Sequence, residues 1–126
     1  MNLSRRVVLF FLLISGSAAF AGIQANSMKQ GNGIYSSYEK DTVIIRFDYK
    51  QSALYHPYTF EVIDSIVSLL KRNKEVTLSI DGYAYKDEGS DTICYFLSLN
   101  RALFIQTYIL GRGIDSSRIV SVTAYG

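Results

Sequence analysis

The chain has 126 residues, with 13 basic and 11 acidic side chains and a single cysteine. This length leaves room for one domain, and a nearly neutral chain without a basic run gives no electrostatic reason to expect nucleic acid as a partner. One cysteine excludes an internal disulfide.

The N-terminus has the pattern of an export signal. Arg5 and Arg6 precede a short apolar run from Val7 to Ile14, and Ala19-Phe20-Ala21 fits a cleavage site between small residues. The pattern predicts a secretory signal peptide over residues 1–21 and a mature protein in the periplasm or cell envelope. An uncleaved membrane anchor is the alternative, but a spanning helix needs about 20 apolar residues, and this run is shorter.

Strand formers follow a polar segment. Residues 22–33 are polar and glycine-containing, which is typical of a flexible lead-in. Ile34 to Tyr38 and Thr42 to Phe47 are rich in strand-forming residues, with a turn near Lys40-Asp41, and they predict a hairpin. The domain itself is therefore expected over residues 34–126.

A helix and a second core strand come next. Pro57 suits the first turn of a helix, because its missing N–H would have no partner there. The segment from Tyr58 to Arg72 carries apolar residues at helical spacing, and Val76 to Gly82 alternates as a strand does.

A second helix is predicted from about Thr92 to Leu110, with Asp91 as its N-cap and Gly113 just beyond its end. Ile119 to Ala124 reads as a further strand. The helix carries two apolar stripes, one of Leu97, Ala102, Ile105 and Ile109, and one of Phe96, Leu99, Leu103 and Leu110. Apolar residues nearly all round a helix suggest burial on both sides.

Residues for catalysis are scarce. The only histidine, His56, is far in sequence from Cys94, so a nucleophile–base pair has little support. Asp87, Glu88 and Asp91 share one loop without calcium-loop spacing, and they are interpreted as a solvated loop. No enzyme, cofactor or metal site is expected.

The order of residues from about Thr42 to Gly126 resembles the peptidoglycan-binding domain at the C-terminus of outer membrane protein A (OmpA). The positions in register are Phe47, Asp48, Leu54, Ile80, Gly82, Gly89, Leu97, Ser98, Arg101, Ala102, Ile105, Tyr108, Ile109, Gly113, Ile114, Arg118, Ile119, Tyr125 and Gly126. The resemblance implies an α+β fold: a βαβαβ core with two helices on one face of a small mixed sheet, preceded here by a hairpin strand.

The resemblance also implies a binding site. In the family an arginine at the position of Arg101 holds a carboxylate of diaminopimelate in the peptidoglycan stem peptide, and a guanidinium fork suits that role. Tyr85 takes the place of the family's aspartate, and Cys94 that of its asparagine. The expected ligand-binding residues are Arg101, Tyr85, Asp87 as a substitute carboxylate, and Leu97 of the same motif.

Two functions follow as expectations. The first is non-covalent attachment to peptidoglycan, in which Arg101→Ala would cost about 1.5–3 kcal/mol of binding and Arg101→Lys would recover only part of it. The alternative is a protein-interaction subunit on the same scaffold that has lost cell-wall binding. Its partner, or another copy of the chain, would meet Phe96, Leu99 and Leu103.

The family's sheet has one more strand than this sequence supplies. In the family the chain continues to a final strand that lies antiparallel between the first and second core strands, whereas the printed sequence stops at Gly126. We expect either that the first strand closes on the second, or that Ile34 to Tyr38 or a partner's strand fills the gap.

Overall fold

The structure, a computed structural model, describes residues 8–15, 28–30, 33–39 and 42–126, with side chains over 42–126. The elements of the first part are β1 (Val8–Ser15), β2 (Met28–Gln30), β3 (Gly33–Glu39) and β4 (Thr42–Phe47). Those that follow are α1 (Pro57–Arg72), β5 (Thr77–Gly82), a short 3-10 helix (Lys86–Glu88), α2 (Asp91–Gly111), a second 3-10 helix (Ser116–Arg118) and β6 (Ile119–Ala124). The fold is α+β, as the sequence predicted.

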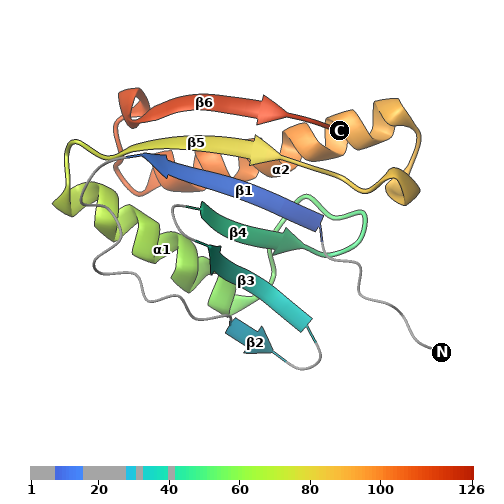
Figure 1. The fold of residues 1–126 in the computed structure, drawn as a ribbon, viewed down its shortest axis with the longest axis horizontal. Helices are drawn as coiled ribbons and strands as arrows, with labels where there is room; N and C mark the ends of the chain where they lie inside the picture. The colour runs from blue at the N-terminus through green and yellow to red at the C-terminus, as the bar shows by residue number, and fades with distance from the viewer. Residues whose placement is uncertain (1–7, 16–27, 31–32, 40–41) are drawn as a thin grey trace.

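The strands form one mixed sheet in the order β2-β3-β4-β1-β5-β6 (Figure 1). The predicted hairpin is confirmed, because β3 pairs antiparallel with β4, from Ser36 opposite Ile45 to Glu39 opposite Thr42. β5 and β6 are parallel neighbours joined through α2, which makes the predicted βαβ unit. Predicted and observed bounds of β4 and β6 coincide. Those of α1 and β5 differ by one residue at one end, and those of α2 by one residue at each end.

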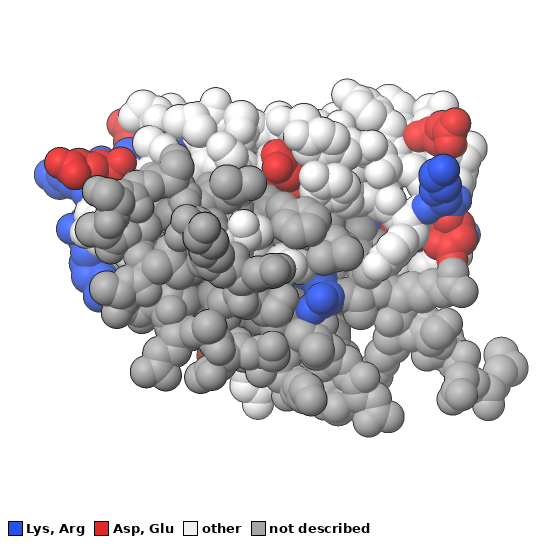
Figure 2. All heavy atoms as spheres, in the orientation of Figure 1, with Lys and Arg blue, Asp and Glu red and all other residues white. Residues whose placement is uncertain are grey.

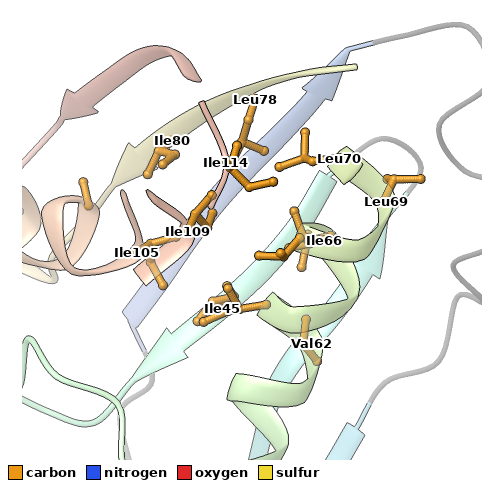
Figure 3. Close-up of a cluster of buried hydrophobic side chains, with 14 of the residues drawn as sticks. Ile45, Val62, Ile66, Leu69, Leu70, Leu78, Ile80, Ile105, Ile109 and Ile114 are labelled. Carbon is orange, nitrogen blue, oxygen red and sulfur yellow. The ribbon is translucent and has the colours of Figure 1, made fainter. Parts of the chain in front are cut away.

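Both helices pack against the same face of the sheet and enclose one apolar core (Figure 3). The strands contribute alternate residues and the helices contribute residues at three- and four-residue spacing, as expected for these elements. The apolar residues of this core with no exposed surface are Val43, Ile45, Val62, Ile63, Ile66, Leu70, Leu78, Ile80, Ala102, Ile105 and Ile109.

The N-terminal segment supplies the central strand, which is the largest departure from the sequence-based expectations. β1 pairs antiparallel with β4 on one side and with β5 on the other (Figure 1). Two of the expectations for the gap are therefore wrong: β4 does not pair with β5, and β3, which contains Ile34 to Tyr38, lies on the outer side of β4. The remainder of the predicted signal peptide, with its cleavage site, lies outside the described residues.

Part of the predicted flexible lead-in is also a strand. β2 pairs antiparallel with β3, with a register shift between Met28 and Lys29. The interpretation of residues 22–33 as a flexible lead-in is therefore wrong for residues 28–30 and for Gly33. The remaining residues of that range, 22–27 and 31–32, lie outside the described part.

The ends of α2 are defined by caps. Ser90, not the predicted Asp91, is the N-cap, and its hydroxyl accepts a hydrogen bond from the N–H of Ile93 at 3.3 Å. Past the C-terminal end, Gly113 has φ +88°, the left-handed conformation that glycine adopts without strain. By length and composition alone α2 could cross a membrane, but core helices pass the same test, and α2 packs on β5 and β6.

Candidate functional site

Arg101 lies on α2 with its side chain fully buried. Its Nε, Nη1 and Nη2 donate hydrogen bonds to the main-chain carbonyls of Gln51 at 2.7 Å, Tyr83 at 3.1 Å and Asp48 at 3.3 Å. Nη1 and Nη2 also donate to the two carboxylate oxygens of Glu88, at 3.0 and 2.8 Å. A guanidinium has five N–H groups, so these five bonds satisfy it completely within the chain.

Glu88 is the counter-ion of Arg101 and is itself only 1% exposed. Besides the fork from Arg101, its carboxylate accepts hydrogen bonds from the main-chain N–H groups of Lys50 at 2.7 Å and Tyr85 at 2.9 Å. Burial alone would raise the pKa of Glu88, but the hydrogen bonds from Arg101, Lys50 and Tyr85 and the charge of Arg101 outweigh burial and lower the pKa. Glu88 is therefore a stable carboxylate in this site.

The Arg101–Glu88 pair joins three separate parts of the chain. The loop after β4 supplies the Lys50 N–H, with Lys50 in the left-handed conformation at φ 58°. The loop after β5 supplies Glu88, and α2 supplies Arg101. Close by, the Tyr49 hydroxyl donates to the Asp87 carbonyl at 2.8 Å, which ties the same two loops together. The pair thus fixes the loops at the ends of β4 and β5 to the helix.

The four residues predicted to bind a ligand are only partly brought together. Arg101 is buried, whereas Tyr85 is 42% exposed and reaches the pair through its main-chain N–H. Asp87 is exposed beside Glu88 and does not supply the carboxylate that meets Arg101. Leu97 is partly buried on α2.

Glu88 is the residue that sequence reasoning missed. The interpretation of the Asp87, Glu88 and Asp91 loop as solvated is wrong for Glu88, which is buried. One signal was present: Glu88 lies three residues after Tyr85, the spacing at which a glutamate carboxylate reaches back to a main-chain N–H at the start of a helix. The predicted packing of Cys94 as a small buried residue is confirmed, since it is 5% exposed.

Two hollows lined by described residues lie beside α2. One of about 250 Å³ is lined by Ala84, Lys86, Asp91, Cys94, Tyr95, Tyr125 and Gly126. A shallower one of about 420 Å³ is lined by Ser52, Ala53, Asn100, Leu103, Phe104, Thr107 and Tyr108. Arg101 lines neither of them.

On the face drawn in Figure 2, the described charged side chains gather mainly at the two ends, with both signs at each end. Within the part of the chain that the structure describes, no group of three or more histidine, cysteine, aspartate or glutamate residues is arranged to hold a metal ion.

Comparisons of this chain with protein-family models, with curated proteins and with solved structures found no match.

Proposed function

We propose that this chain is an exported, non-catalytic OmpA-like domain that acts through protein–protein contacts, and that it uses Arg101 for its own architecture rather than for the cell wall. The observation that carries this proposal is the closed state of Arg101. All five of its donors are bonded within the chain, and Glu88 occupies the position at which a ligand carboxylate would be held.

The cost of opening the site supports the same proposal. An incoming carboxylate would have to replace Glu88. The Glu88 carboxylate would then lose its two hydrogen bonds from Arg101 and also those from the N–H groups of Lys50 and Tyr85. A hydrogen bond to a charged group is worth about 1.5–3 kcal/mol, and the new ligand would regain only those made by Arg101. Exchange is therefore unfavourable for a ligand that offers a carboxylate alone.

The apolar stripe of α2 is the surface that we assign to a protein partner. Phe96 is 54% exposed and Leu103 40% exposed, while Leu99 between them is partly buried. The expectation that α2 is buried on both sides is thus wrong within a single chain. Leu103 also lines the hollow of about 420 Å³, so a partner side chain could enter beside the stripe.

Sedimentation with purified peptidoglycan sacculi tests the proposal. We expect the protein to stay in the supernatant under conditions in which a peptidoglycan-binding OmpA-like domain sediments with the sacculi. Arg101→Lys, which keeps the charge and loses the fork, should behave like the parent. Sedimentation of the parent with the sacculi would overturn the proposal.

Peptidoglycan binding is the second candidate function, favoured by the position of Arg101 in the Leu97-Ser98-x-x-Arg101-Ala102 motif. It requires the short 3-10 helix Lys86–Glu88 to swing away so that Glu88 leaves Arg101. The variant Glu88→Gln weakens the pair while keeping its shape. If this second function holds, Glu88→Gln should sediment with sacculi more strongly than the parent does.

A further inference from the structure

Among the strands that the structure describes, only β1 joins the two halves of the sheet. Its residues Val8 to Leu13 lie opposite Phe47 to Thr42 of β4, and its residues Phe10 to Ser15 lie opposite Gly82 to Thr77 of β5. β4 and β5 have no pairing with each other. Without β1, each of the two would present a row of main-chain N–H and C=O groups without sheet partners, and such an edge is a template for another strand.

The buried neighbours of β1 on β4 and β5 favour an apolar strand at this position. Register places Phe10 opposite Ile45, and Leu12 opposite both Val43 and Ile80. These neighbours on β4 and β5 have no exposed surface and belong to the core. Because alternate residues of a strand face the same side of a sheet, an occupant needs apolar residues at every second position.

Val8 to Ile14, all of β1 except Ser15, form most of the apolar run of the predicted export signal. Cleavage after Ala21 would remove the whole of β1. A segment cannot be both a discarded signal and the central strand of the processed domain. Export would therefore change the state of the sheet.

We propose that the gap between β4 and β5 is a strand-binding site, which Val8–Ser15 fills until export processing removes it. It then takes up an uncharged, apolar β-strand of a partner protein that runs antiparallel to both neighbours. This inference rests on the export proposed above. Main-chain bonds on both sides of the incoming strand supply the affinity, and apolar residues at alternate positions supply the specificity.

The test starts from the folded full chain with a protease site inserted between Ala21 and Gly22. After cleavage the N-terminal fragment is removed by gel filtration in urea and the rest of the chain is returned to native buffer. Hydrogen exchange is then followed at the amides of β4 and β5 and of α1. Removal should raise exchange in both strands by at least about tenfold, as expected for local opening. A synthetic peptide of residues 8–15 with lysine tags should restore the protection.

A peptide that carries Leu12→Pro is the matched control, because proline removes a ladder N–H and does not fit a central strand. It should restore nothing. The α1 amides report whether the whole domain unfolds on removal of the fragment; recovery of α1 together with both strands on addition of the parent peptide would still support the proposal. Strands that stay protected after the fragment has gone, or that the parent peptide fails to protect, would overturn it.

Mass spectrometry of the chain recovered from the periplasm separates this inference from the proposed function. If the recovered chain begins at Gly22 and the exchange result is as expected, both stand. A chain that is never exported would contradict the proposed function, and the processing step of the inference with it, whatever the peptide does in vitro. Exported and cleaved protein that does not take up the peptide would contradict the strand site alone.

Discussion

At position 101 a guanidinium with no exposed surface donates five hydrogen bonds, two of them to a carboxylate that is almost as deeply buried. A buried ion pair is costly to assemble, because both charges lose water. It persists here because every donor of Arg101 is used and the Glu88 carboxylate accepts four bonds. The Arg101 side chain also lies over the ring of Phe47, at 5.6 Å from its centroid.

Arg101→Ala should reduce the free energy of unfolding by about 3–5 kcal/mol, because it leaves Glu88 as a buried charge without its partner. Urea denaturation measures the loss. The double variant Arg101→Ala/Glu88→Ala should lose less than the sum of the two single variants, since neither charge is then left alone. Additive losses would mean that the two side chains do not stabilise each other.

The lowered pKa of Glu88 predicts a dependence of stability on acid. An unfolded glutamate has a pKa of about 4.3, so between that value and the lower folded pKa the unfolded state binds more protons. The free energy of unfolding therefore rises with pH in this window. The contribution of Glu88 is fully present above about pH 4.3 and is lost as the pH falls through the folded pKa.

Urea midpoints of the parent and of Glu88→Gln, followed from neutral to acid pH, isolate this contribution from those of other carboxylates. The parent should lose stability more steeply than Glu88→Gln on the acid side. Parallel curves for the two proteins would contradict the assignment of a lowered pKa to Glu88.

At this scale the sequence indicated half of the site. Arg101 was singled out by its motif, but a motif carries no information on whether a side chain meets a ligand or its own chain. Glu88 was not singled out, because an acidic residue in a polar loop is ordinarily solvated. Its burial depends on the loop after β4, which supplies the Lys50 N–H from 38 residues away in sequence.

Among the elements, α2 has one face that packs in the core and another that is exposed. One face packs Ala102, Ile105 and Ile109 into the core, and another exposes Phe96 and Leu103. α2 also approaches β5 closely at Gly82, where an added Cβ would meet the main-chain carbonyl of Ser98. These contacts fix the position from which Arg101 reaches the loops.

Leu103→Glu should shift the assembly of the protein toward smaller species, because burying a charge in an apolar interface is unfavourable. Analytical ultracentrifugation, alone and with a captured partner, measures the shift. Val120→Glu is the matched control, since Val120 is 58% exposed on β6, away from the stripe. Equal effects of both variants, or none of Leu103→Glu, would contradict the role of the stripe.

Gly82→Ala should destabilise the domain by about 1–3 kcal/mol, the range for overpacking a well-packed position. The atom that the new Cβ meets belongs to the main chain of α2, which cannot move aside as a flexible side chain would. Gly111→Ala is the control: nothing lies within 4 Å of its added Cβ, and replacing a helical glycine should gain up to about 1 kcal/mol. Thermal unfolding compares the two, and a Gly82→Ala variant as stable as the parent would contradict this packing.

Element positions were predictable because their signals are local. Periodicity located α1 and α2, Pro57 marked the first residue of α1, and alternation located β4 to within a residue. The N-cap of α2 was placed one residue late, since Ser90 and Asp91 are both good caps and only geometry decides between them.

For the whole molecule, the decisive feature is the strand that completes the sheet. An eight-residue apolar run after two arginines has the composition of an export signal and of a buried strand alike, and composition cannot separate them. The residues that β1 pairs with lie 29 to 39 positions away in β4 and 62 to 72 positions away in β5. Such long-range pairing depends on which edges are left unpaired and not on any local pattern.

The internal use of Arg101 is tested most directly by NMR of its Nε–H group. A donor bonded to the Gln51 carbonyl in a fully buried side chain should give a resolved, slowly exchanging signal. The signal should remain unchanged when a soluble stem peptide containing diaminopimelate is added. Fast exchange in the free protein, or a shift of this signal that saturates as the peptide is added, would contradict the closed site.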